Sequence, residues 1–188
     1  MTEEESNGQV ITIGGPHGSG RSTVAKAVAE HFNLRHFSTG KVFREVASKR
    51  NLSVSELNES AEREVDLEVD RRSKEEAAKG GVVIESDLAA WMNPGSDVKI
   101  WLTASLDERA RRIYNDEKKR HAEEYSTLEE AKEIVKKRDN EDKRRYKEYY
   151  DIDLDDLSIY DLVLDTEDLI VQEVINNVIS YIEDRVGD

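Results

Sequence analysis

A glycine-rich stretch directly after a short apolar run is the feature that most limits what this chain can fold into. Residues 10–13 read VITI, which is typical of a buried strand, and residues 15–23 read GPHGSGRST. Helix-forming residues follow from position 24 to position 29. A strand, a glycine-rich turn and a helix start in this order form the architecture that binds nucleotide phosphates.

The spacing within this stretch matches the phosphate-loop pattern at every position but one. Glycines at 15, 18 and 20 permit positive φ and let backbone N–H groups point at anionic oxygens. The hydroxyl of Ser22 is predicted to bind Mg²⁺. The predicted ATP-binding residues are Gly15, Pro16, His17, Gly18, Ser19, Gly20, Arg21, Ser22 and Thr23. The alternative is an ordinary glycine turn between a strand and a helix.

Arg21 stands where the phosphate-loop pattern has lysine. The change keeps the positive charge and replaces a compact ammonium by a planar fork. Two interpretations follow: Arg21 neutralises phosphate charge in place of the lysine as a catalytic residue, or it marks a nucleotide binder that has lost catalysis. His17, inside the loop, is interpreted as a variable position.

Charge and composition limit the classes of partner that the chain could bind. Its 188 residues suit one domain, and 28 Lys and Arg against 42 Asp and Glu give a net charge of −14. Such a charge disfavours nucleic acid and anionic membranes as partners. The chain is expected to be a monomer. The acid excess fits either life at high salt or an acidic surface in ordinary cytosol.

Three absences point to a cytoplasmic protein. No apolar run is long enough to span a membrane, and residues 1–6 are acidic, unlike a signal peptide. The chain has no cysteine, which excludes disulfides and thiolate catalysis.

Short apolar runs alternate with helical stretches along the chain. The expected strands are residues 9–13, 35–38, 82–85, 98–103 and 161–164. This alternation predicts an α/β fold with a parallel sheet, and the continuous runs at 82–84 and 100–102 are expected at its centre, covered on both faces. Ser53 and Thr127 each precede a glutamate by three residues, the capping-box pattern of a helix start. A last helix is expected over residues 169–182.

A polar turn follows the second expected strand, with Ser38, Thr39 and Gly40, and Arg44 comes one helical turn later. Together with the phosphate loop, this turn resembles the acceptor site of nucleoside monophosphate kinases. The resemblance implies a three-layer P-loop kinase fold with a five-stranded parallel sheet flanked by helices. It also implies one domain over residues 1–188, with an acceptor-binding segment at about 40–80 and a lid at about 105–156. The alternative is an N-capped helix with a solvated arginine.

The segment 138–146 reads RDNEDKRRY and places Arg138, Asp142 and Arg145 on one helix face. It is similar to the segment by which cytidylate kinases hold CMP, which implies that these three side chains reach its phosphate, ribose and base. Residues 64–72 and 146–163 resemble archaeal-type cytidylate kinases, and the resemblance adds Arg71 to the acceptor residues. The alternative is a charged helix with i,i+4 ion pairs.

The resemblance also covers the residues after the third strand and those that open the lid. Glu85 matches the acid that orders Mg²⁺ through water, but Asp87 stands where the family more often has arginine. Arg109 and Arg112 match arginines at the start of the mobile lid and are expected to be catalytic. Arg111 and the basic run 118–120 are interpreted as solvated surface.

The implied activity is Mg²⁺-dependent transfer of the ATP γ-phosphate to CMP or dCMP. Two alternatives remain at this point: an AMP or UMP kinase of the same fold, and a regulatory protein that binds ATP without transferring phosphate.

Overall fold

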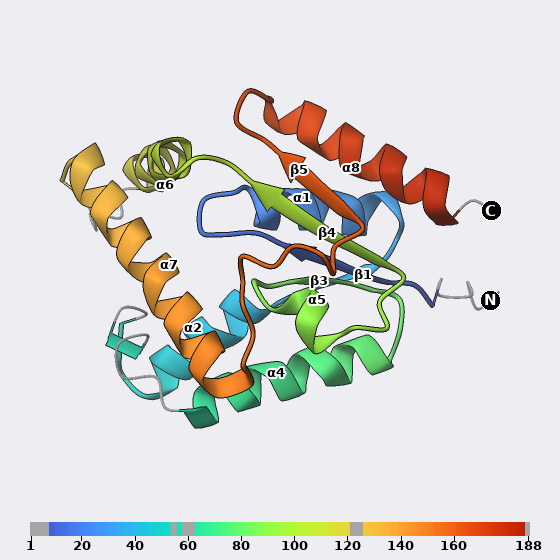
Figure 1. Ribbon diagram of the computed structural model, residues 1–188, viewed down its shortest axis with the longest axis horizontal. Coiled ribbons are helices and arrows are strands. Elements are labelled where there is room, and N and C mark those ends of the chain that lie inside the picture. The colour runs from blue at the N-terminus through green and yellow to red at the C-terminus, as the bar shows by residue number, and fades with distance from the viewer. Residues whose placement is uncertain (1–7, 54–55, 58–62, 121–125, 187–188) are drawn as a thin grey trace.

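Five parallel strands form a single sheet in the order β2-β3-β1-β4-β5 (Figure 1). The computed structural model describes residues 8–53, 56–57, 63–120 and 126–186, and only the backbone of residues 117–120. The strands are β1 (Val10–Gly14), β2 (Arg35–Ser38), β3 (Val82–Glu85), β4 (Val98–Thr103) and β5 (Leu162–Asp165). The sequence prediction is confirmed for β2, β3 and β4, and it is wrong by one residue for β1 and β5. Residues 1–6 lie outside the described ranges.

Helices cover both faces of this sheet. They are α1 (Arg21–His31), α2 (Thr39–Lys49), α4 (Arg63–Ala78), α5 (Ala89–Met92), α6 (Leu106–Arg120), α7 (Leu128–Tyr150) and α8 (Val171–Val186). α1 and α8 lie on one face and α5 on the other, next to α4 (Figure 1). None of the helices in the described ranges combines the length and the apolarity that a membrane span requires. The three-layer α/β prediction is confirmed.

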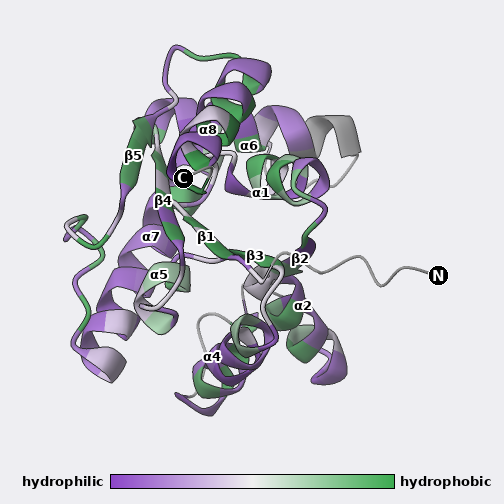
Figure 2. Ribbon diagram, turned by 90° about the vertical axis from the view of Figure 1, so that its right-hand side faces the viewer, coloured by the Kyte–Doolittle hydropathy of each residue, from purple (hydrophilic) through white to green (hydrophobic). Residues whose placement is uncertain are grey.

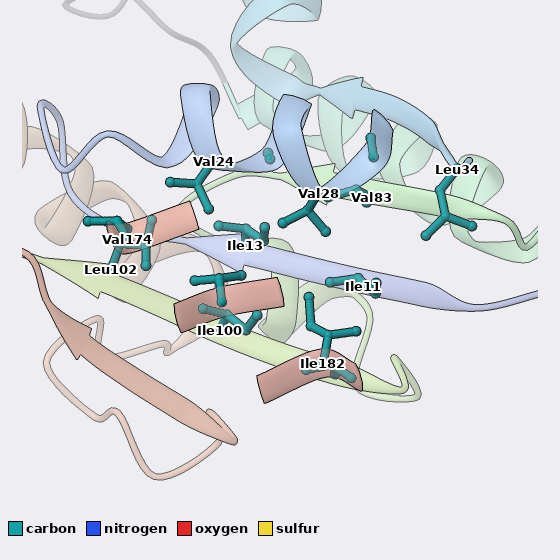
Figure 3. Packing of buried hydrophobic residues seen from close by; sticks show 14 residues of the cluster. Ile11, Ile13, Val24, Val28, Leu34, Val83, Ile100, Leu102, Val174 and Ile182 are labelled. Atoms are coloured by element: carbon teal, nitrogen blue, oxygen red, sulfur yellow. The ribbon is translucent and has the colours of Figure 1, made fainter. Parts of the chain in front are cut away.

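The main core lies between the sheet and the α1 and α8 face. Fourteen buried residues form it, with Val24 and Val28 from α1, Val178 and Ile182 from α8, and alternate residues of β1 and β4 (Figure 3). β3 contributes to both faces, since Val83 joins this cluster while its neighbours pack in a smaller cluster on the other side. Burial on both faces explains why the strands read as continuous apolar runs.

A separate, smaller cluster joins α2 to α4. Its buried members are Ala47, Leu57 and Val65. The capping box predicted at Ser53 is confirmed. The Ser53 N–H donates to Glu56 at 2.8 Å, and the Glu56 N–H donates to Ser53 Oγ at 3.1 Å. This side of the molecule therefore has its own local packing, away from the main core.

The predicted capping box at the start of α7 forms only in half. The Glu130 N–H donates to Thr127 Oγ1 at 3.2 Å. The Glu130 carboxylate does not return to the Thr127 N–H and instead accepts from the Ser126 N–H at 2.8 Å. Both contacts still satisfy N–H groups at the helix start.

Parallel register brings the carboxyl ends of the strands to one edge of the sheet. Ile13 pairs with Glu85 across β1 and β3, and Ser38 pairs with Glu85 across β2 and β3. The residues that follow these strands therefore meet, and α6 and α7 lie beyond the same edge (Figure 1). Ligand sites of open α/β sheets lie at this edge.

Candidate nucleotide site

The glycine-rich stretch closes around the start of α1. Gly18 and Gly20 adopt φ of 81° and 89°, the left-handed region that glycine enters without strain. A Cβ on Gly18 would lie 2.6 Å from the Arg109 backbone oxygen, so only glycine fits there. Gly20 caps α1 without a side-chain hydrogen bond, and the first turn holds no acidic residue. The N–H groups and dipole of this helix end can therefore bind an anion.

Arg21 makes two contacts through the same nitrogen atom. Its Nη1 donates to the Gly15 backbone oxygen and forms an ion pair with Asp87 Oδ1. Only 16% of the Arg21 side chain and 10% of the Asp87 side chain are exposed. The two positions at which the sequence departs from the family pattern are thus in direct contact.

Glu85, the last residue of β3, receives hydrogen bonds from two neighbouring segments. Ser22 of α1 donates to Oε1, Ser38 of β2 donates to Oε1 at 3.3 Å, and the His36 Nε2 lies 2.9 Å from Oε2. Burial alone would raise the pKa of Glu85, but these hydrogen bonds and the Arg21 charge outweigh burial and hold it below its ordinary value. The carboxylate therefore stays ionised at neutral pH.

The polar turn at the start of α2 is fastened to the same strand. Thr39 Oγ1 donates to the Glu85 backbone oxygen at 3.3 Å, and Thr39 is the first residue of α2. Arg44 is exposed, and its Nη1 lies 3.5 Å from where a Cβ on Gly40 would stand. A Cβ at Gly40 would make only an ordinary contact with Arg44, so the roles of Gly40 and Arg44 stay predictions.

Asp142 and Arg145 of α7 form a buried ion pair. Arg145 Nη2 donates to Asp142 Oδ1 at 2.9 Å, and Arg145 Nε lies 2.9 Å from Asp66 Oδ2 of α4. The other oxygen of Asp142 lies 2.9 Å from His17 Nε2 in the phosphate loop. These contacts connect α4, α7 and the phosphate loop directly.

Two carboxylates one turn apart on α4 face α7. Desolvation raises the pKa of Asp66 to about 6, since the favourable charge of Arg145 is offset by Asp70 and Asp142 nearby. Burial also raises the pKa of Asp70, which accepts a hydrogen bond from the Tyr150 hydroxyl. The contact region between α4 and α7 is thus rich in buried charge.

Arg109 and Arg112 of α6 both lie against the phosphate loop. Arg109 Nη1 donates to the His17 backbone oxygen at 2.8 Å and pairs with Asp139 of α7 at 2.8 Å. Arg112 donates to the Thr166 backbone oxygen at 2.6 Å and reaches the Ser19 backbone oxygen at 3.5 Å. In this structure both guanidinium groups join α6 to neighbouring segments.

The other predicted basic residues have different surroundings. Arg138 is half-buried on α7. Arg71 is exposed on α4 and pairs with Glu68 at 2.7 Å and with Glu75. Arg111 is exposed and pairs with Glu108 at 2.7 Å, in agreement with its interpretation as surface. The side chains of residues 118–120 lie outside the described part.

A cavity of about 240 Å³ lies between the phosphate loop, the end of β4, α7 and the segment before β5. Pro16, Trp101 and Leu157 form apolar walls, whereas Asp87 and Asp142 bring carboxylates to it. Trp101 also packs against Tyr160, with ring centroids 5.0 Å apart. The cavity combines apolar walls with convergent polar groups, as ligand sites do.

Four residues of this region were not assigned roles from the sequence. They are His36, Asp66, Asp139 and Thr166, which contact Glu85, Arg145, Arg109 and Arg112 respectively. His17 was interpreted as a variable position, yet it contacts Asp142. The one available signal was the placement of Asp66 beside Val65 on the apolar side of α4, where an acid needs a partner.

Comparisons with known proteins find relatives over most of the chain. A family model described as "AAA domain" matches residues 14–145. The chain is 42% identical over 177 residues to a cytidylate kinase of Staphylothermus marinus, covering 93% of this chain and 96% of that protein. It is 44% identical to cytidylate kinases of Methanocaldococcus jannaschii, with 93% and 97% covered, and of Haloarcula marismortui, with 84% and 80% covered.

Solved structures support the fold. A protein from Eubacterium ventriosum superposes with a TM-score of 0.70 at 22% identity, covering 94% of this chain and 99% of that one. A shikimate kinase from Bacteroides thetaiotaomicron superposes with a TM-score of 0.63 at 16% identity, covering 94% and 97%. At these identities the likeness establishes the architecture alone.

Proposed function

The chain belongs to the cytidylate kinase family of P-loop kinases, and from that membership we propose that it transfers the γ-phosphoryl group of ATP to CMP, with dCMP as a second acceptor. The transfer is direct and forms no covalent intermediate on the protein. Phosphoryl transfer asks the protein mainly for positioning and charge stabilisation. The described residues supply both.

The phosphate loop, residues 15–23, binds the phosphates of ATP. The start of α1 supports this proposal. No side chain caps this helix end, so its N–H groups and its dipole are available to bind phosphate. Arg21 adds a guanidinium group whose positive charge is shared with Asp87. Together these groups neutralise the polyanion and hold it still.

Ser22 and Glu85 are suited to hold Mg²⁺. A hydroxyl and an ionised carboxylate are hard oxygen donors of the kind that Mg²⁺ prefers, and the two side chains are already in contact. When bound, Mg²⁺ supplies charge neutralisation between the phosphate oxygens of ATP. His36 keeps the Glu85 carboxylate oriented through its 2.9 Å contact.

Asp142 and Arg145 recognise the cytosine base of the acceptor. Cytosine presents an N4 amino donor and two acceptors, N3 and O2, so a carboxylate beside a guanidinium complements its edge. Uracil presents a carbonyl oxygen in place of that amino group and would face Asp142 unfavourably. The observation that supports this assignment is that Asp142 lines the cavity of about 240 Å³, with the Arg145 guanidinium 2.9 Å from its Oδ1.

Further arginines complete the proposed site. Arg44 and Arg138 hold the acceptor phosphate, with Ser38, Thr39 and Gly40 forming the turn beside it, and Arg71 remains a predicted contributor. Arg109 and Arg112 supply charge at the transferring group, and their contacts with backbone oxygens of the phosphate loop support that position.

Two segments are proposed to move relative to the core of a monomeric enzyme. Residues 40–80 form the acceptor-binding segment, supported by the separate packing of α2 against α4. Residues 105–156 form the lid, supported by the packing of α6 against α7 beyond the edge of the sheet. In Figure 2 both lid helices are mostly hydrophilic, which suits a segment that covers the core without belonging to it.

A coupled phosphotransfer assay with ATP and Mg²⁺ tests the proposal. CMP, dCMP, UMP and AMP are compared as acceptors, and we expect CMP to give a kcat/KM at least about tenfold above UMP and AMP. Turnover that favours AMP or UMP would contradict the acceptor assignment. ATP binding without turnover of any acceptor would make the chain a regulatory nucleotide binder.

An Asp142→Asn variant tests the base-reading pair directly. An amide nitrogen can donate to the uracil carbonyl, so the preference for CMP over UMP should fall by about tenfold or more. Asp184→Asn, which changes an exposed aspartate on α8, is the matched control. Equal preferences in both variants would remove Asp142 from base recognition.

A further inference from the structure

Arg21 and Asp87 come from different segments and meet beside the phosphate loop. Arg21 opens α1 after β1, and Asp87 lies in the turn after β3, the strand next to β1. The Arg21 Nη1 pairs with Asp87 Oδ1 and also donates to the Gly15 backbone oxygen. Each residue replaces a different member of the family pattern, lysine in one case and arginine in the other.

Neither change is favourable alone. A carboxylate close to a phosphate repels it unless a cation cancels the negative charge of the carboxylate. A buried carboxylate without a partner also has a high cost of desolvation. Arg21 removes both penalties, since its charge cancels that of Asp87 where the overall exposure of the aspartate is 7%.

The planar guanidinium makes this pairing compatible with phosphate binding. Arginine has five N–H groups, and both printed contacts of Arg21, the hydrogen bond to Gly15 and the ion pair with Asp87, fall on Nη1. Three N–H groups on Nε and Nη2 remain for phosphate oxygens. A lysine ammonium is one small charge on a flexible stem, so the same carboxylate would draw it away from the phosphates.

We propose that Asp87 is a positioning residue for Arg21, and that the two residues act as a matched pair in phosphoryl transfer. The carboxylate and the Gly15 carbonyl fix one edge of the guanidinium, so that its other edge faces the phosphates of ATP. This inference rests on the proposed kinase activity and concerns which residues make the activity possible in this chain.

The test is the effect of Asp87→Asn in two backgrounds, the natural chain and Arg21→Lys. In the natural chain we expect kcat to fall about tenfold while the KM for ATP changes less than about threefold, because orientation is lost but a repelling charge is lost with it. Arg21→Lys alone should lower kcat about a hundredfold. In that background Asp87→Asn should raise kcat, because it releases the lysine.

We therefore expect Asp87→Asn to lower kcat in the natural chain and to raise kcat in the Arg21→Lys background. Asp87→Asn that lowers kcat by the same factor in both would overturn the pairing, as would an Arg21→Lys variant as active as the natural chain. The double variant Arg21→Lys with Asp87→Arg, which restores the family pattern, should recover at least tenfold over Arg21→Lys. Failure of that recovery counts against the pair.

Two controls keep the outcomes distinct. Asp151→Asn changes an exposed aspartate paired with Lys147 at 2.5 Å and should leave kcat within about twofold. Urea unfolding of each variant shows whether it is folded, and the asparagine substitution keeps the side-chain shape. Absence of turnover in the natural chain would defeat the proposed function itself, whereas turnover without the change of sign defeats only the matched pair.

Discussion

Glu85 and Asp66 are both buried carboxylates in the same site, yet their surroundings act in opposite directions. On the donor side, hydrogen bonds from His36 and Ser22 outweigh burial and hold the pKa of Glu85 below its ordinary value. On the acceptor side, burial dominates at Asp66, and its pKa rises to about 6 although Arg145 is adjacent. Burial alone therefore does not decide the charge of a carboxylate, since the balance of partners does.

The contrast extends to how each side is held together. The phosphate loop and α1 are seated on the main apolar core through Val24 and Val28. The contact of α4 with α7 relies on the pairs Asp66 with Arg145 and Asp70 with Tyr150. We infer that the donor side is preorganised by packing, whereas the acceptor side is held by charges that respond to pH and to ligands.

The largest expected effect comes from breaking the donor side. Gly18→Ala places a Cβ 2.6 Å from the Arg109 backbone oxygen at a φ of 81°. We expect kcat/KM for ATP to fall by about a hundredfold or more, because the cradle of N–H groups is distorted. Gly20→Ala is the matched control, since its φ is 89° but no atom lies within 4 Å of the new Cβ. Steady-state kinetics with varied ATP should rank Gly18→Ala well below Gly20→Ala.

The next largest effect comes from removing the buried arginine of the acceptor side. Arg145→Ala should raise the KM for CMP by about a hundredfold and the KM for ATP by less than about threefold, because it removes a charge-assisted contact to the base. Arg138→Ala should act in the same direction. Arg144→Ala, which changes an exposed neighbour paired with Glu148 at 3.3 Å, should leave both KM values nearly unchanged. Equal increases for CMP and ATP would contradict the acceptor assignment.

A third prediction concerns pH and sharpens the contrast of the two carboxylates. Because the pKa of Asp66 is about 6 in the folded chain and 3.8 ordinarily, protonation of Asp66 favours the folded state. Its contribution to the free energy of unfolding should fall by roughly 3 kcal/mol in all as pH rises from below 3.8 through the folded pKa of about 6, and level off only above about pH 7. Asp66→Asn should remove this fall, as urea unfolding across that pH range can measure.

Glu85, on the proposed donor side, should change the free energy of unfolding with pH in the opposite direction. The pKa of Glu85 is lowered in the folded chain, so its ionised form favours folding above the ordinary value of 4.5, and that contribution is lost as pH falls below 4.5. Glu85→Gln should remove this loss of stability below the ordinary pKa of 4.5. Asp184→Asn, which changes an exposed aspartate on α8, is the control variant for both pH profiles. If the Asp66 and Glu85 variants changed the free energy of unfolding with pH in the same way, the two carboxylates would not differ as we infer.

The smallest effect is expected at the exposed face of α4. Arg71 pairs with Glu68 and Glu75 with more than half of its side chain exposed, so Arg71→Ala should leave the free energy of unfolding nearly unchanged. Its predicted role in CMP binding should appear as an increase of the CMP KM of about twofold to fivefold. An unchanged CMP KM would leave Arg71 with a surface role only.

Most of the fold could be predicted because it depends on local patterns. Apolar runs bounded by turn residues identified all five strands, and the spacing of Gly15, Gly20 and Ser22 identified the phosphate loop. The boundary errors at β1 and β5 are single residues. Gly14 continues β1 although glycine is a weak strand former, because its backbone pairs with Trp101 of β4.

Contacts between distant segments could not be predicted in the same way. The partners Arg21 and Asp87 are 66 positions apart, and His17 and Asp142 are 125 apart, so no local pattern relates them. Each of these side chains looks like an isolated polar residue until the sheet brings its segment to the common edge. The resemblance to a family supplied roles for several residues but not the partners that orient them.

The shared hydrogen bonding of Glu85 has a consequence for how the two substrates affect one another. Its side chain accepts from Ser22 in the phosphate loop, and its backbone oxygen accepts from Thr39 in the acceptor turn. A single residue thus contacts both the phosphate loop and the proposed acceptor turn. If the binding of ATP changes the affinity for CMP by some factor, thermodynamic reciprocity requires that CMP change the affinity for ATP by the same factor.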